Sequence, residues 1–180
     1  MFNERIFSIG ITVAQLNNIE NNLLCEQIKN HNNGREELKR DLNLNNAELL
    51  HLNNVVLTQS QKILDGLAEG LKVKLKRVWG NHNFNSDICI PHTHRDSFLS
   101  AVYYPKSTDG RIQFYSPFTD AILSHVPVVA DKYHEFNSSQ HTVYPKTGWL
   151  ILFPANLLHV VLPSKEERHS IVYDIGVKLI

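Results

Sequence analysis

The chain has 180 residues, a length that predicts one domain whose core needs neither disulfides nor a structural metal. Its 18 basic residues balance its 18 acidic ones, and no basic block suggests a surface for nucleic acid. The two cysteines, Cys25 and Cys89, are far apart and match no metal or redox spacing, which favours a reducing compartment. The first residues resemble neither a secretory signal nor a membrane span, so we expect a cytoplasmic protein without nucleic-acid or membrane partners.

Helical patterns dominate the first 77 residues. A short strand is predicted over 6–13, followed by a helix over 15–29 whose apolar residues recur at helical spacing: Leu16, Ile19, Leu23, Leu24 and Ile28. Ser60 is expected to cap a second helix, with an apolar stripe formed by Ile63, Leu64, Leu67, Leu71 and Leu75. Gly66 and Gly70 would permit close packing of that helix against a sheet, although they lower its helix propensity.

Short strands separated by Pro, Gly, Asn and Asp dominate the rest of the chain. We expect them at 73–79, 87–92, 98–105, 111–116, 141–145, 149–154, 157–163 and 169–179. This pattern predicts an α+β domain, in which helices pack on the outside of an antiparallel double sheet that forms a barrel or jelly roll. Residues 1–180 would form one domain, with a helical support region at 1–77 and a β core at 78–180. The long segment 117–140 is expected to supply loops over the mouth of a site.

Two histidine-containing segments are candidates for a metal site. In PHTHRD, residues 92, 94 and 96 share one face of an extended segment, and His159 follows a second apolar strand. Two distant strands could therefore deliver imidazoles to one point. The chain has ten histidines, so one H-x-H arises easily by chance, and six others are expected to be surface or hydrogen-bonding residues: His31, His51, His82, His125, His134 and His141.

Two ligand sets fit these residues, and the spacing leaves both open. One is His94, Asp96 and His159, which matches the facial triad of two histidines and one carboxylate in non-haem Fe(II) oxygenases. The other is His92, His94 and His159, in which Asp96 would orient an imidazole from outside the ligand set. His94 and His159 belong to both.

Several short motifs follow one another in the second half of the chain: WGN at 79–81, HTH at 92–94, SFLSAVYY at 97–104, GWLILFP at 148–154, then His159 and Arg168. In this order they resemble a family of 2-oxoglutarate/Fe(II) oxygenases found in bacteria and marine phages, whose members are similar to prolyl hydroxylases. The family pattern has a glycine where this chain has Ala101, a small change. The resemblance implies a double-stranded β-helix (jelly roll, cupin-like) with packed N-terminal helices.

The resemblance also implies roles for individual residues. His94, His159 and Arg168 would be catalytic, with Fe(II) as the metal and 2-oxoglutarate as co-substrate. Arg168 would hold the far carboxylate of 2-oxoglutarate, because a planar guanidinium suits a carboxylate, and Ser170 would add a hydroxyl from the same strand face. Tyr104 would either point its phenol at that carboxylate or be a core aromatic. The enzyme would use O2 to hydroxylate a small molecule or peptide, and a phage-encoded member would act in the host cytoplasm.

Two other classes of protein fit the same histidines. A cupin-like metalloenzyme could bind Fe, Mn or Zn without 2-oxoglutarate, but it would not need Arg168 at this spacing. A non-catalytic β-barrel binding protein could bury the histidines for structural reasons, since fold alone does not establish function.

Overall fold

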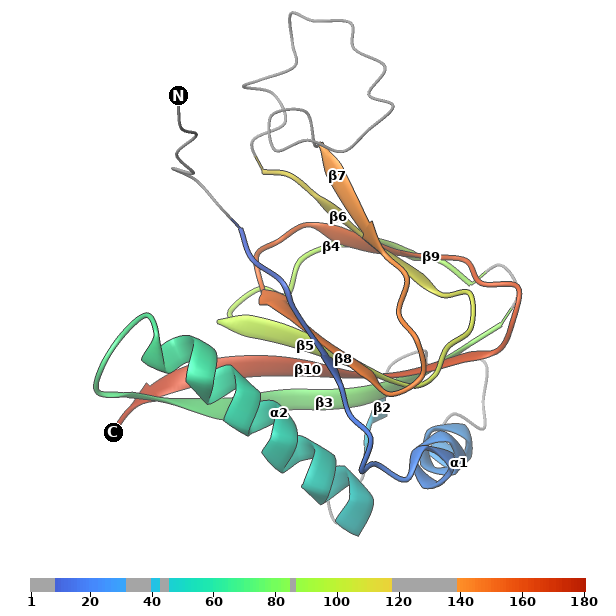
Figure 1. Ribbon diagram of the computed structural model, residues 1–180, viewed down its shortest axis with the longest axis horizontal. Helices are drawn as coiled ribbons and strands as arrows, with labels where there is room; N and C mark the ends of the chain where they lie inside the picture. Colours follow the sequence, from blue (N-terminus) through green and yellow to red (C-terminus); the bar gives the residue numbers. More distant parts are fainter. Residues whose placement is uncertain (1–8, 32–39, 43–45, 85–86, 118–138) are drawn as a thin grey trace, which may run out of the picture.

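Two antiparallel sheets face each other in the computed structural model, which describes residues 9–31, 40–42, 46–84, 87–117 and 139–180 (Figure 1). The larger sheet has the strand order β1-β8-β5-β10-β3-β2, and the smaller one has the order β4-β9-β6-β7. The elements are β1 (Thr12–Gln15), α1 (Asn21–His31), β2 (Arg40–Asp41), α2 (Ala47–Asp65), β3 (Leu71–Asn83), β4 (Cys89–His92), β5 (Leu99–Lys106), β6 (Arg111–Tyr115), β7 (Gln140–Val143), β8 (Trp149–Pro154), β9 (His159–Leu162) and β10 (Arg168–Leu179). The α+β double sheet predicted from the sequence is confirmed.

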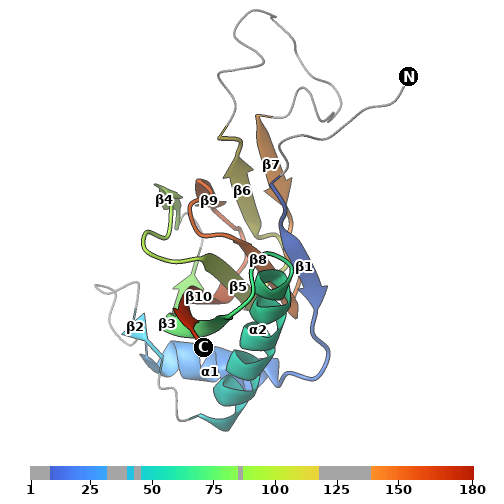
Figure 2. The same cartoon turned by 90° about the vertical axis from the view of Figure 1, so that its left-hand side faces the viewer.

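Both helices cover the outer face of the six-stranded sheet, away from the four-stranded sheet (Figures 1 and 2). A first apolar core fills this outer layer and combines helix residues such as Leu24 and Leu52 with the outward face of β5 and β10. A second core lies between the sheets and includes Trp79, Tyr104 and Phe153. Because side chains alternate along a strand, neighbouring residues such as Tyr103 and Tyr104 belong to different cores.

The helices differ from their predicted ranges. The first begins at Asn21, because Gln15 pairs with Trp149 in the sheet and a bend at residues 18–19 separates this strand from the helix. Its buried stripe contains Leu24 and Ile28, whereas Leu23 is exposed. Residues 6–8 of the predicted first strand lie outside the described part of the chain.

The second helix begins at Ala47, well before the predicted cap at Ser60. Asn46 is the N-cap, since its side-chain oxygen accepts hydrogen bonds from the amides of Glu48 and Leu49 at 2.9 and 3.2 Å. Ser60 instead donates to the carbonyl of Val56 within the helix.

The second helix ends at Asp65, before the last residues of the apolar stripe that we predicted for it. Gly66 caps the C-terminus, and Gly70, at φ +72°, turns the chain into β3, so Leu71 and Leu75 are strand residues. Neither glycine packs closely against the sheet, contrary to our prediction. The predicted boundary at 77/78 also falls inside β3, and β1 and β2 add strands from the N-terminal region to the large sheet.

The strands of the second half follow the prediction closely. β8 spans the predicted residues 149–154, and the other strands differ from their expected ranges by a few residues at their ends. The predicted loop segment 117–140 lies largely outside the described residues, which stop at Pro117 and resume at 139.

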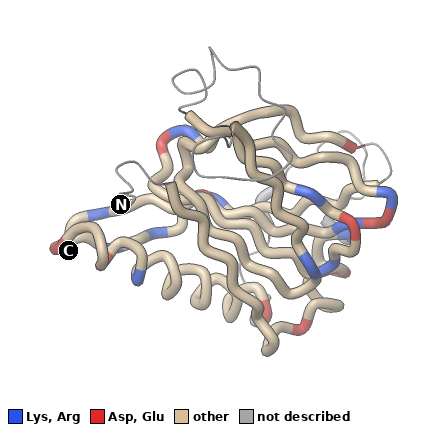
Figure 3. The backbone as a smooth tube through the Cα atoms, turned by 45° about the horizontal axis from the view of Figure 1, so that its top comes forward, with Lys and Arg blue, Asp and Glu red and all other residues tan. Residues whose placement is uncertain are grey.

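Basic and acidic positions are both distributed over the described backbone: Lys and Arg positions lie among Asp and Glu positions (Figure 3). Cys25 and Cys89 form no disulfide. Within the described residues, no helix combines the length and the apolar character needed to cross a bilayer.

Candidate metal and co-substrate site

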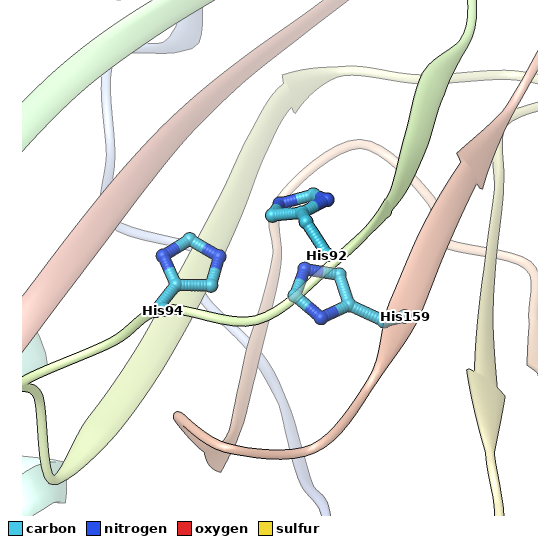
Figure 4. A group of neighbouring side chains, drawn as sticks. All are labelled: His92, His94 and His159. Carbon is cyan, nitrogen blue, oxygen red and sulfur yellow. The ribbon is translucent and has the colours of Figure 1, made fainter.

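Three of the candidate histidines meet at the end of the four-stranded sheet. His92 on β4 and His159 on β9 are directly paired in the strand register, and the amide of His94 donates to the carbonyl of Ala155 at 2.8 Å. Each of the three imidazoles has a ring nitrogen within 4.8 Å of the others, so one ion could contact all of them (Figure 4). His159 and His94 are buried, and His92 is partly exposed.

The hydrogen bonds of these rings assign their protons. Nδ1 of His92 lies 2.8 Å from the carbonyl of Ile90, and Nδ1 of His159 lies 2.9 Å from the carbonyl of Leu157. A carbonyl oxygen can only accept, so each Nδ1 carries the proton and each lone pair is placed on Nε2. Nδ1 of His94 faces a carboxylate oxygen of Asp174 at 2.6 Å, which has the same consequence. All three neutral imidazoles thus have a tautomer suited to binding a metal through Nε2.

The two carboxylates near His94 have different positions. Asp96 is exposed, lies in a turn at φ +63°, and is not part of the three-residue group. Asp174 on β10 instead holds the His94 ring. The sequence reasoning missed Asp174, although it stands six residues after Arg168 and therefore on the same strand face.

Apolar rings surround the two buried histidines. Phe153 stands at 4.8 Å from His159 between ring centroids, and Trp79 stands at 5.7 Å from His94. Phe114 packs on Phe153 at 5.0 Å, which places Phe153 and Phe114 in the core, as predicted. These rings exclude water from one side of the cluster.

Arg168 points into the space between the sheets and is 2% exposed. Its Nη1 donates to the carbonyl of Leu162 at 3.0 Å, whereas its Nε has no hydrogen-bond partner. Within the described residues, no carboxylate lies within salt-bridge distance of this guanidinium. Burial lowers the pKa of Arg168, partly offset by Tyr104 and Asp109. A buried cation without a counterion is costly, so this position is suited to an anionic ligand.

Gly110 makes room for that guanidinium. A Cβ atom at Gly110 would lie 3.0 Å from Cδ of Arg168 and 2.6 Å from Oγ of Ser107. The loop between β5 and β6 that contains Gly110 therefore does more than reverse the chain, because it also leaves space for the Arg168 side chain.

The family described as "Putative 2OG-Fe(II) oxygenase" matches residues 77–174, more than half of the chain. The protein belongs to this oxygenase family. It is therefore an oxidoreductase of the class that uses Fe(II) and 2-oxoglutarate, as the sequence motifs predicted. A search of curated proteins finds no match to the sequence.

Solved structures of oxygenases share the fold over nearly the whole chain. A prolyl-4-hydroxylase from Pseudomonas putida has a TM-score of 0.61 at 20% identity, covering 94% of this chain and 93% of its own. The viral collagen prolyl hydroxylase of Paramecium Bursaria Chlorella virus-1, solved with 2-oxoglutarate, has a TM-score of 0.59 at 14% identity, covering 92% and 94%. HygX from Streptomyces hygroscopicus, solved with nickel and 2-oxoglutarate, has a TM-score of 0.62 at 10% identity, covering 93% and 83%. These likenesses confirm the predicted double-stranded β-helix.

Buried polar atoms of this oxygenase fit a dicarboxylate co-substrate. The hydroxyl of Tyr104 and Nε1 of Trp79 are both buried without a hydrogen-bond partner among the residues that the structure describes. Burial raises the pKa of Tyr104, so the phenol stays protonated and can donate. Ser170 is buried on the strand face of Arg168, and its hydroxyl accepts from the Asn81 side chain at 3.4 Å. Tyr104 lies close enough to Arg168 for the two to interact electrostatically, so together they suit an anionic ligand.

A second group of possible ligands, His82, Glu167 and His169, lies on the oxygenase near Arg168. Here Glu167 already contacts Lys29 and Lys106, and Nε2 of His82 stands 2.7 Å from its carboxylate. A divalent cation would have to displace two ammonium groups, so this group acts as an ion-pair network. His82, expected to be a surface residue, is partly buried in it.

Proposed function

We propose that His92, His94 and His159 hold Fe(II) through their Nε2 atoms. The observation that carries this proposal is a cluster of three imidazoles whose ring nitrogens lie within 4.8 Å of one another and whose Nδ1 atoms each face a hydrogen-bond acceptor. A set of three histidines on one side of the ion leaves coordination positions for a bidentate co-substrate and O2. The exposure of Asp96 favours this set over the alternative that includes Asp96.

Arg168 would bind the far carboxylate of 2-oxoglutarate, with Tyr104 and Ser170 as neutral donors. An arginine fork matches a carboxylate with two parallel hydrogen bonds, and the buried setting strengthens them. When bound, the metal and co-substrate would supply the oxidising chemistry, in which O2 gives one oxygen atom to succinate, formed with CO2 from 2-oxoglutarate, and the other to a substrate C–H bond, which becomes C–OH. The chain orients both ligands, and the rings of Phe153 and Trp79 keep water from the metal side.

The proposed substrate is a peptidyl or free amino acid. Support comes from the likeness in fold to two prolyl hydroxylases along nearly the full length of the chain. The test incubates the enzyme with Fe(II), 2-oxoglutarate and either free L-proline or a proline-containing peptide, and mass spectrometry then looks for a product that has gained one oxygen atom.

A cupin-like metalloenzyme without 2-oxoglutarate would give no reason to bury Arg168 with no carboxylate of the described residues within salt-bridge distance. A non-catalytic binding protein would not need three imidazoles clustered around one point. Formation of succinate from 2-oxoglutarate, even without a substrate, separates these cases. We expect Fe(II)-dependent succinate from the wild type and none from His159→Ala. Stoichiometric metal binding without succinate would favour the cupin-like enzyme, and absence of metal binding would favour the binding protein.

A further inference from the structure

The metal site contains a carboxylate that the motif does not supply. Asp174 lies on the central strand β10, and its Oδ1 contacts Nδ1 of His94 at 2.6 Å. The His94 side chain is 5% exposed and that of Asp174 is 18% exposed, so the contact is shielded from solvent on most sides. Among the described contacts of these rings, Nδ1 of His92 and Nδ1 of His159 face backbone carbonyls, whereas Nδ1 of His94 faces the carboxylate of Asp174.

The contact between His94 and a carboxylate affects the net charge of the site. Three neutral imidazoles bring no negative charge to a divalent metal, whereas the facial triad of two histidines and a carboxylate brings one. In total charge, a dianionic co-substrate would offset Fe(II), and the carboxylate of Asp174 would offset the cation of Arg168, six residues away on β10. The charge total would equal that of a site with a carboxylate ligand, although here the carboxylate acts through an imidazole.

The backbone holds Asp174 firmly in this position. Asp174 pairs with Arg77 of β3 on one side and with Ser100 of β5 on the other. The β10–β3 register shifts directly after Asp174, which leaves Lys76 as the extra residue of a bulge. The Lys76 ammonium donates to the carbonyl of Asp96, in the turn that follows His94. A bulge next to a site commonly re-aims side chains, and here it ties the His94 segment to β3 and β10.

We infer that Asp174 is a positioning residue of the metal site, which fixes the Nδ1–H tautomer of His94 and supplies, through that imidazole, the negative charge that the three ligands lack. This inference rests on the proposed function. Strand β10 would then contribute to both parts of the site, since Arg168, at the proposed co-substrate position, and Asp174, at the proposed metal position, stand on the same face of that strand.

The test compares Asp174→Asn and Asp174→Ala with Asp65→Asn, a matched control at the end of α2, where the carboxylate accepts only from the nearby Gln61 side chain among its described hydrogen bonds. Nickel(II) affinity is measured on the full chain by competition with a coloured chelator. Loss of such a partner typically weakens metal binding about 10- to 100-fold. We expect a loss in this range for the alanine variant, about tenfold for the asparagine variant, and none for the control.

A second measurement does not depend on metal or turnover. Two-bond ¹H–¹⁵N spectra of the metal-free protein report the tautomer of each histidine. We expect His94 to be protonated at Nδ1 in the wild type and to lose this preference in Asp174→Ala. Wild-type affinity in both Asp174 variants, or an unchanged His94 tautomer in the alanine variant, would overturn the inference and leave the proposed function standing. A wild type that binds no nickel would overturn the proposed function and this inference with it.

Discussion

Replacing Arg168 with methionine separates two effects of the buried guanidinium: the free energy that its burial costs the folded protein, and the binding energy that it would give to 2-oxoglutarate. Truncating a large buried side chain normally costs several kcal/mol, and Arg168 is among the largest fully buried side chains. Among the described residues no carboxylate pairs with this ion, whose burial costs several kcal/mol, and the one hydrogen bond described there, to Leu162, returns about 1.5–3 kcal/mol. Methionine has a similar length and no charge. We therefore expect the ligand-free variant to be no more than about 1 kcal/mol less stable than the wild type, or to be more stable.

Thermal unfolding in the presence of nickel, with and without 2-oxoglutarate, measures both effects. At a concentration of 100 times its Kd, the co-substrate should stabilise the wild type by about 2.7 kcal/mol, which raises Tm by about 5–10 °C for a chain of this size. The variant should lose this shift. Arg111→Met, at an exposed arginine of β6, should change stability by less than about 0.5 kcal/mol and keep the full shift. A ligand-free Arg168→Met protein that is several kcal/mol less stable, or one that keeps the 2-oxoglutarate shift, would refute the reasoning.

Three further changes test the surroundings of the site. Gly110→Ala should push the Arg168 side chain aside and weaken 2-oxoglutarate binding at least about tenfold, whereas nickel affinity should stay unchanged. Calorimetry can measure both affinities. An unchanged 2-oxoglutarate affinity would mean that Ser107 and Arg168 can shift without loss of binding. Tyr104→Phe removes one donor to a carboxylate and should weaken 2-oxoglutarate binding about 10- to 100-fold, whereas an unchanged affinity would make Tyr104 a core aromatic only. Burial, with a smaller contribution from His82, lowers the pKa of His169 to about 4. Between pH 6.5 and 4 the unfolded chain therefore binds more protons than the folded protein, so the free energy of unfolding should fall as the pH drops through that window. His169→Phe should flatten this fall in urea unfolding measured at several pH values, and an unchanged slope would count against it.

Much of the β core could be predicted because its local and tertiary signals agree. The strand at 149–154 is an uninterrupted apolar run ended by a proline, and it is buried on both faces between β1 and β5. The helices were harder to predict. Leu71 and Leu75 continue a helical spacing by chance, but Gly66 and Gly70 stop the helix, and tertiary pairing with β10 decides the strand.

Some residues of the candidate site could likewise be selected from the sequence, and others could not. His92 and His94 share a short motif, and His159 pairs with His92 across two strands, so periodicity selected three histidines that the fold also brings within reach of one ion. Asp174 could not be ranked from the sequence, because its role depends on a contact with a residue 80 positions earlier in the chain. The role of Gly110 likewise depends on the path of the Arg168 side chain, which spacing does not reveal.

The central claim is that three histidines hold the metal and Arg168 holds the co-substrate. Anaerobic titration of the metal-free protein with Fe(II) and 2-oxoglutarate tests both parts through the weak visible charge-transfer band of the complex. The account predicts this band in the wild type and in Asp96→Asn, and its loss in His92→Ala and in Arg168→Ala. A band that survives in His92→Ala and disappears in Asp96→Asn would contradict the account and assign the metal to His94, Asp96 and His159.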